Sequence, residues 1–251
     1  MNLASELQQI KPLTRASSLP GFEYVRGYGV FSLPFDSGHV LALRVFPEND
    51  FAPYVTIWHR SPDGKWSIFG DSVSVETACP RYYGAACSHV QFSRIKLTWT
   101  GPMDLSIEMD EPRLSWSVSM TTTPLVRLMN MVSPRLPDPL WRAPTMLRIW
   151  ELAGRTFFDL GDFKLSGTMP SGHFGILMPQ RMFPIISTKA NLAGQDLGQG
   201  ARVKENPSIG KARLPARPTF AIGRAFFKIL DPVEYERTVK ELRQKAHQSA
   251  T

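Results

Sequence analysis

Imidazole and indole side chains lie close together in one short stretch of this sequence. In "TIWHRSPDGKWSIFG", residues 56–70, Trp58 and His59 precede a Ser-Pro-Asp-Gly turn and Trp66 follows it. A histidine that is partly shielded from water can be tuned to donate or accept a proton near neutral pH. Aromatic faces attract positive charge and can stabilise a developing cation. Together these groups would suit alkene protonation, hydration, cyclisation or isomerisation.

Other groups able to transfer or share a proton follow further along the chain. Tyr82 and Tyr83 stand side by side in "CPRYYGAAC", and His89 begins the next apolar run. We predict His59 and His89 as candidate catalytic acid/base residues, with Tyr82 and Tyr83 as hydrogen-bond donors. His39, which begins another run after a Gly-containing turn, is predicted to contact a ligand. The alternative for each histidine is a structural, hydrogen-bonded role at a strand edge.

Tryptophans would form the walls of such a site. Alternate side chains of a strand share a face, so Trp58 and Arg60 point one way and His59 points the other way. In "RLSWSVSMT", Trp116 alternates with serines in the same manner. We predict Trp58, Trp116 and Arg60 as ligand-binding residues, together with His39. Burial in a barrel core is the alternative for both tryptophans, because aromatic side chains dominate protein cores.

No metal or cofactor motif accompanies these residues. The two cysteines, Cys79 and Cys87, are expected to be free thiols, because the predicted compartment is reducing. A zinc site would need two further ligands, and only His89 is near. The phosphate-binding loop, the dinucleotide fingerprint, G-x-S-x-G and H-E-x-x-H are absent. We therefore expect no cofactor and no metal.

Short strands must position these side chains. Between residues 22 and 123 the sequence has runs rich in β-branched and aromatic residues, each bounded by Gly, Pro, Asp or Asn. The turns "DSGH", "SPDGK", "TGPMD" and "DEPR" favour tight connections, and strands joined in this way pair antiparallel. The alternation in "DLSIEM" and "RLSWSVSMT" indicates a sheet with one dry and one wet side. The pattern predicts an N-terminal antiparallel meander or barrel over residues 22–123.

The rest of the chain divides into a helical connector and a second β part. Residues 124–161 include "TMLRIWELAGRTFF", with apolar residues at three- and four-residue spacing, which predicts a helix. Residues 162–251 contain further strand-like runs, a basic loop and a closing helix with Asp231 as its predicted N-cap. The predicted fold class is mainly β: an antiparallel barrel, single or as two partial barrels, with a connecting helix and a C-terminal helix.

Positive charge is concentrated in one segment. The 251-residue chain has a net charge of +7 and a pI near 9.6. Residues 200–228 hold seven Lys or Arg against Glu205 alone, and seven minus one leaves +6. Such a basic, Pro- and Gly-rich loop could meet phosphates, an acidic partner or an anionic membrane, and a solvated loop is the plainer alternative. We do not expect nucleic acid as a partner, because no recognition motif accompanies the loop.

No stretch reaches the roughly 18–20 apolar residues that a membrane-spanning helix needs. The N-terminal "MNLASELQQIKPLTR" lacks the basic start, apolar block and cleavage site of a secretory signal, so we expect a cytoplasmic protein. The apolar segment 125–132 is expected to pack across one end of a barrel, and the alternatives are a lid over a pocket or a contact with a membrane interface.

The meander, the W-H-R-x-P-D-G-x-W hairpin, "IKLTWTGPMDLSIEMDEPRLSWSVSM" and "PSGHFGILMP" together resemble the lipocalin-like (calycin) proteins of the carotenoid 1,2-hydratase and AttH type, over residues 24–230. This resemblance implies lipocalin-like barrels around an apolar cavity and terpenoid or polyketide substrates. It also implies cofactor-free hydration or cyclisation started by an acidic residue.

Two hypotheses of function follow. In the first, a hydrophobic small molecule such as a terpenoid, polyketide or lipid binds in an apolar β-barrel pocket and is acted on by a cofactor-independent hydratase (a lyase), isomerase or cyclase. In the second, the protein is a non-enzymatic carrier of a lipid or other hydrophobic ligand, or a membrane-surface protein that docks through residues 200–228. The sequence leaves the ligand and the oligomeric state open.

Overall fold

Strands make up most of the regular structure. The computed structural model describes residues 2–248, without the side chains of Val75 and residues 243–248. The helices are α1 (Leu3–Gln8), α2 (Pro80–Tyr83), α3 (Pro124–Val132), α4 (Asp138–Arg142), α5 (Pro144–Phe158) and α6 (Pro232–Gln248), with 3₁₀ turns at Val75–Thr77, Gly84–Ala86 and Ser133–Arg135. The strands are β1 (Leu13–Thr14), β2 (Phe22–Pro34), β3 (Val40–Asn49), β4 (Tyr54–Arg60), β5 (Trp66–Asp71), β6 (His89–Phe92), β7 (Ile95–Gly101), β8 (Asp104–Met109), β9 (Leu114–Met120), β10 (Ser166–Thr168), β11 (Phe174–Leu192), β12 (Gln195–Asp196), β13 (Ser208–Ile209), β14 (Ala212–Arg213) and β15 (Thr219–Lys228).

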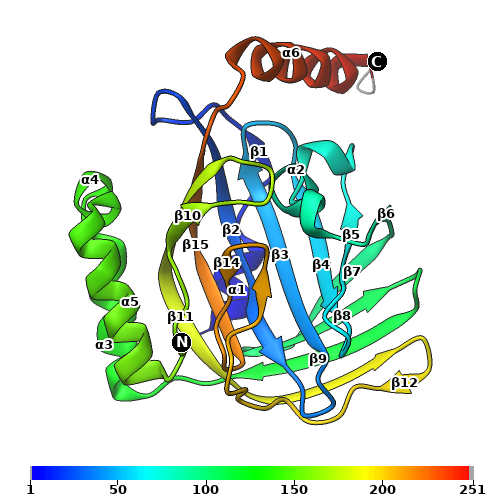
Figure 1. Cartoon of the computed structure of the whole chain (residues 1–251), viewed down its shortest axis with the longest axis vertical. Helices are drawn as coiled ribbons and strands as arrows, with labels where there is room; N and C mark the ends of the chain where they lie inside the picture. The colour runs from blue at the N-terminus through cyan, green and yellow to red at the C-terminus, as the bar shows by residue number, and fades with distance from the viewer. Residues whose placement is uncertain (1, 249–251) are drawn as a thin grey trace.

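A curled sheet shaped as a half-barrel forms the body of the molecule (Figure 1). Its strand order is β6-β5-β4-β3-β2-β15-β11-β9-β8-β7. Neighbours on this path pair antiparallel except β5 and β6, which are parallel. The predicted mainly β, largely antiparallel fold is therefore confirmed. Strands from the N-terminal meander and from the C-terminal part share this sheet, because β15 lies between β2 and β11.

Turn chemistry explains the hairpin of β4 and β5. The backbone N of Ser61 donates to the carbonyl O of Lys65 at 3.0 Å, and the N of Gly64 donates to the O of Ser61 at 2.9 Å. Gly64 has a φ of 89°, a left-handed conformation that glycine adopts without a steric penalty. The pairing places Trp58 opposite Ile68, so these two side chains lie on the same face of the sheet.

The central strands have two buried faces. One face packs on the apolar side of β7, β8 and β9, where the Trp99 ring centroid lies 6.5 Å from that of Tyr28 and 6.4 Å from that of Phe220. The second face, which carries Trp58 and Phe227, is covered by α2 and by the segments around β10 and β13–β14. In Figure 1, β10 and β14 lie in front of β2, β3 and β15. Burial on both faces explains why these strands are almost continuously apolar in sequence.

Glycines on the second face admit the backbone of neighbouring strands. A Cβ on Gly27 in β2 would lie 1.8 Å from the carbonyl O of Val45 in β3. A Cβ on Gly223 in β15 would lie 2.1 Å from the carbonyl O of Met178 in β11. The strand register shifts beside both glycines, and such bulges bend a strand and increase its twist. The two glycines therefore allow the close approach that accompanies the curl of the sheet.

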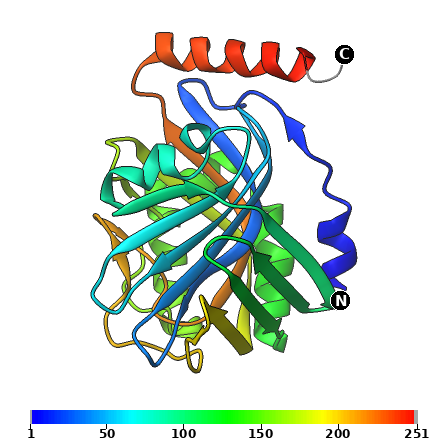
Figure 2. The ribbon, with the colours of Figure 1, turned by 90° about the vertical axis from the view of Figure 1, so that its right-hand side faces the viewer.

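Helices lie around the sheet. The helices α3, α4 and α5 form a layer beside β11, and α6 crosses the top of the molecule by itself (Figures 1 and 2). The Tyr235 hydroxyl of α6 donates to Oδ2 of Asp50 at 3.0 Å, and its ring lies 5.7 Å from that of Phe51. Oδ1 of Asp231 accepts two backbone N–H bonds at the start of α6. Among the described residues, no helix has both the length and the apolar composition of a membrane span.

We expect Gly27→Ala to destabilise the protein by about 3 kcal/mol or more, because the backbone of β3 would have to move to admit a Cβ. Urea unfolding followed by circular dichroism measures this change in the free energy of unfolding. Gly167→Ala is the control, since an added Cβ at Gly167 in β10 meets nothing within 4 Å. That substitution should change stability by less than about 0.5 kcal/mol. Equal effects of the two substitutions would contradict the close approach of β2 and β3.

Candidate functional site

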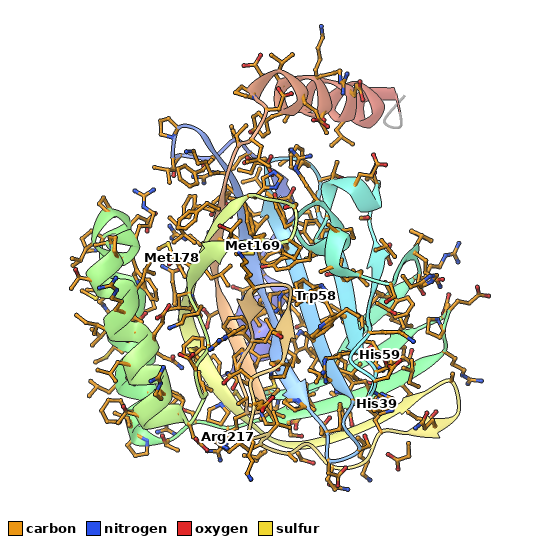
Figure 3. The ribbon with its side chains drawn as sticks, in the orientation of Figure 1. His39, Trp58, His59, Met169, Met178 and Arg217 are labelled. Atoms are coloured by element: carbon orange, nitrogen blue, oxygen red, sulfur yellow. The ribbon has the colours of Figure 1, made fainter. Side chains whose placement is uncertain are left out.

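A cavity lies between the second face of the sheet and the segments that cover it. It offers about 90 Å³ of space for the centres of water molecules. One water needs about 10–15 Å³ on this measure, so the cavity has room for several waters or for a small organic molecule. The strands β2, β3, β4, β11 and β15 form the sheet side, and α2 and Leu214 contribute from the cover. Figure 3 shows two lining residues, Trp58 and Met178, on opposite sides of β2 and β15.

Small residues form the floor of the cavity. Gly27 and Gly29 come from β2, and Ala221, Gly223 and Ala225 come from β15. The register pairs Gly27 with Gly223 and Gly29 with Ala221, so these positions lie side by side on one face. None of these residues has a side chain longer than a methyl group. The space that larger side chains would fill is therefore left open above the sheet.

Aromatic side chains surround this floor. The ring centroids of Trp58 and Tyr83 are 4.5 Å apart, and Tyr82 stacks on Phe227 at 3.7 Å. Nε1 of Trp58 donates to Oγ1 of Thr56 at 3.1 Å, so this indole N–H already has an acceptor in the protein. The aromatic lining includes Phe31, Phe46, Tyr54, Trp58, Tyr82, Tyr83 and Phe227, and the aliphatic lining includes Leu177, Met178, Pro179 and Leu214.

A buried ion pair positions the two tyrosines of α2. Pro80 occupies the first turn of this short helix. The Tyr82 hydroxyl donates to Oε2 of Glu23 at 2.6 Å, and Arg81 donates to both oxygens of the same carboxylate, from Nε at 2.9 Å and from Nη2 at 2.6 Å. Glu23 is fully buried, so these charge-assisted hydrogen bonds anchor α2 to β2. Burial and the neighbouring Glu23 hold the pKa of Tyr82 well above its ordinary value.

Arg44 of β3 brings a positive charge to the cavity. Its Nη1 donates to the carbonyl oxygens of Val30 at 2.6 Å and of Leu43 at 3.0 Å, and its Nη2 donates to that of Phe31 at 3.0 Å. The central carbon of the guanidinium lies 4.8 Å from the centroid of the Trp58 ring, within the range of a cation–π contact. An arginine remains protonated in proteins, so this charge is permanent.

Weakly acidic groups lie near Arg44 in place of carboxylates. These groups are the Tyr54 and Tyr83 hydroxyls and the Cys79 thiol. Burial raises the pKa of each of them above its ordinary value. At neutral pH they are therefore uncharged, and they offer hydrogen bonds but no negative charge to the guanidinium. Cys79 and Cys87 are both free thiols.

The structure brings together only some of the predicted site residues. Trp58, Tyr82 and Tyr83 line the cavity. Arg60 lies on the same strand face as Trp58 but does not line the cavity. His89 begins β6, where its side chain is exposed to solvent outside the cavity.

His39 and His59 lie next to each other, also outside the cavity (Figure 3). Nδ1 of His39 is 2.9 Å from Nε2 of His59, and the rings stack with centroids 5.1 Å apart. Nε2 of His39 is 3.4 Å from Nε2 of Gln195. Burial and the neighbouring His39 lower the pKa of His59 to about 4, and burial lowers the pKa of His39. Both rings are neutral at pH 7, and one donates a hydrogen bond to the other.

Trp116 belongs to a different part of the core. It is 1% exposed on β9, and its Nε1 donates to Oγ1 of Thr188 in β11 at 3.0 Å. It does not line the cavity, and among the residues that the structure describes the cavity lining contains no His, Asp or Glu. Within the described part of the chain, no three His, Cys, Asp or Glu side chains gather in a cluster that could hold a metal ion.

The basic segment 200–228 is partly neutralised by ion pairs. Its last ten residues form β15, a central strand of the sheet. Three of its arginines pair with aspartates that precede the segment: Arg202 with Asp159 at 2.6 Å, Arg213 with Asp162, and Arg224 with Asp138 at 2.7 Å. The charge of +6 counted along the sequence therefore overstates the positive charge that this segment offers to a partner.

Comparison with protein-family models, with curated proteins and with solved structures finds no match for this chain. The site is therefore interpreted from its own geometry. Arg44 was not among the predicted site residues, although the sequence has one signal for it. In "HVLALRVFP" it is a single charged residue in an apolar run, and a charge within a buried strand requires polar partners.

We expect His59→Asn to reduce the loss of stability in acid. The pKa of His59 is about 4 in the folded protein and about 6.5 in the unfolded chain. Between these values only the unfolded chain binds the proton, so the free energy of unfolding falls as the pH falls from 6.5 to 4, by about 1.4 kcal/mol per unit of pKa difference. Urea unfolding at pH 7 and pH 4.5 measures this fall. An equally steep fall in His59→Asn would refute the prediction.

Proposed function

We propose that the protein binds a small, largely apolar molecule in the cavity beside Trp58. The observation that carries this proposal is a hollow with a Gly and Ala floor and aromatic walls. An apolar space that is left empty costs stability, because the atoms that line it lose packing contacts. A bound apolar ligand would supply those contacts. The resemblance to lipocalin-like proteins also favours a hydrophobic ligand, here on the face of the central strands that points away from β7, β8 and β9.

The lining favours binding over acid-initiated chemistry. Hydration or cyclisation started by protonation needs an acid within reach of the substrate. The cavity offers phenols and a thiol whose pKa values are raised by burial, and its lining, as far as the chain is described, contains no carboxyl or imidazole. We therefore place the role of a binding or carrier protein ahead of that of a hydratase, isomerase or cyclase.

Two tryptophan substitutions test ligand binding. Trp58→Phe and Trp116→Phe each remove an indole whose Nε1 donates to a threonine hydroxyl, so their costs to folding are comparable. We expect 1-octanol to change the intrinsic tryptophan fluorescence of the wild type in a saturable manner. The change should disappear in Trp58→Phe and persist in Trp116→Phe, because only the first of these residues lines the cavity. A wild type without a saturable change, or loss of the change only in Trp116→Phe, would contradict the proposal.

Docking on an anionic membrane surface is a second candidate function, and the helices α3, α4 and α5 favour it. Exposed apolar side chains that are concentrated in one part of a soluble protein mark candidate interaction sites. Of the fifteen large apolar side chains that are exposed among the described residues, eight lie on or between these helices: Leu125, Leu128, Met131, Val132, Leu140, Ile149, Leu152 and Phe157.

Arginines lie among these apolar side chains. Arg127, Arg135 and Arg148 are exposed, and none of them forms an ion pair with a carboxylate in the described residues. Self-association through this face would bring like charges together, whereas anionic headgroups would match them. We therefore propose a lipid surface as the partner of α3, α4 and α5, in place of a surface built on residues 200–228.

Sedimentation with vesicles tests the membrane candidate. We expect the protein to sediment with phosphatidylserine-containing vesicles, less so in high salt, which screens surface charge. Replacing the exposed Leu128 and Leu152 by serine should weaken binding tenfold or more, because burying one leucine side chain is worth about 1.5–3 kcal/mol. Replacing Lys204 and Lys211 by serine is the control for the basic segment and should have a smaller effect. A larger loss of vesicle binding in the lysine variant than in the leucine variant would instead assign the membrane contact to residues 200–228.

A further inference from the structure

Arg44 faces the cavity without a counter-ion. Protein atoms surround its guanidinium, and part of its surface is open to the cavity. It forms no ion pair with a carboxylate of the described residues, and the phenol and thiol groups near it are neutral. Burial of an isolated charge is costly, and the contacts with three backbone carbonyls offset only part of this cost. In agreement with this environment, burial lowers the pKa of Arg44 from its ordinary value.

Other charged side chains around the cavity have partners. Arg81 pairs with the buried Glu23. Arg224 of β15 pairs with Asp138 at 2.7 Å. Arg44 is therefore the exception among the arginines near the cavity, and the missing partner would have to come from the cavity that it faces.

Arg44 also has hydrogen-bond donors left over. A guanidinium has five N–H groups, and the carbonyls of Val30, Leu43 and Phe31 occupy three of them. Nε and one hydrogen on Nη2 have no acceptor among the described residues. The nearby Tyr83 hydroxyl likewise makes no hydrogen bond with another described residue. These groups could hold both oxygens of a carboxylate, the geometry in which arginine binds most strongly.

We propose that the ligand of this cavity is an apolar carboxylic acid whose carboxylate pairs with Arg44 and whose hydrocarbon part lies over the Gly and Ala floor. This inference rests on the proposed function and names its substrate class. The single uncompensated charge and the mainly apolar lining together select a molecule with one anionic end. A neutral ligand such as an alcohol or a hydrocarbon would leave the guanidinium unpaired.

The structural role of Arg44 has to be separated from this proposed role. Its bonds to the carbonyls of Val30 and Phe31 span an irregular stretch of the β2–β3 pairing, so its loss would also destabilise the sheet. An overall loss of affinity would not distinguish the two roles. The ratio of affinities for an acid and the corresponding alcohol distinguishes them, because a distorted cavity would weaken the binding of both ligands.

The test is a calorimetric titration of the full chain with octanoate and with 1-octanol at pH 7.5. The wild type is expected to bind octanoate at least tenfold more tightly than 1-octanol. Arg44→Met should bring this ratio close to one while 1-octanol still binds. Arg224→Met is the control, since it removes an arginine of β15 whose charge is already paired with Asp138 and whose side chain points away from the face that carries Gly223 and Ala225, and it should leave the ratio unchanged.

Thermal melts followed by circular dichroism decide which variant is used. Should Arg44→Met fail to fold, Arg44→Lys takes its place; it keeps the charge but loses the planar fork, and it should reduce the ratio severalfold. A ratio near one in the wild type, or an unchanged ratio in the Arg44 variant that is used, would overturn this inference and leave the proposed function in place. Binding of neither octanoate nor 1-octanol would overturn the proposed function itself.

Discussion

Close contact between the backbones of β2 and β3 is the constraint on which both the sheet and the cavity depend. Because Gly27 has no Cβ, the carbonyl of Val45 can occupy the space beside it, and the strand register shifts at this point. In the irregular pairing that follows, the carbonyls of Val30 and Phe31 accept hydrogen bonds from Arg44. The same stretch of β2 therefore has three effects. The sheet is curled there, a cavity remains above the glycines, and the Arg44 guanidinium is held at the edge of that cavity.

The strands could be predicted from the local pattern of apolar, polar and turn residues, because the formation of each strand depends mainly on the residues within it and beside it. The hairpin of β4 and β5 follows from the turn that ends in Gly64, and the alternation of Leu114, Trp116 and Val118 with serines produced the half-wet strand β9. The position of β15 between β2 and β11 could not be predicted in this way. Its partner β2 lies near the other end of the chain, and an apolar run does not encode which distant edge it joins.

The candidate site was only partly predictable for the same reason. Alternation correctly separated Trp58 from His59, but it does not say which of two buried faces is packed solid and which is hollow. The tyrosines of α2 reach the cavity through the buried pair of Glu23 and Arg81, whose members lie far apart in the sequence. The floor of the cavity likewise exists only where glycines and alanines of β2 and β15 become neighbours.

The walls of the cavity come from two parts of the chain that are synthesised at different times. The residues between Gly27 and Tyr83 leave the ribosome first, whereas those between Leu177 and Phe227 complete the enclosure much later. Until β15 pairs with β2, the indole and phenol rings of the first part have no cover. Contacts between such distant segments form slowly during folding. A nascent chain therefore exposes an aromatic surface before its ligand cavity is complete. During this period the chain is most prone to aggregation and to chaperone binding.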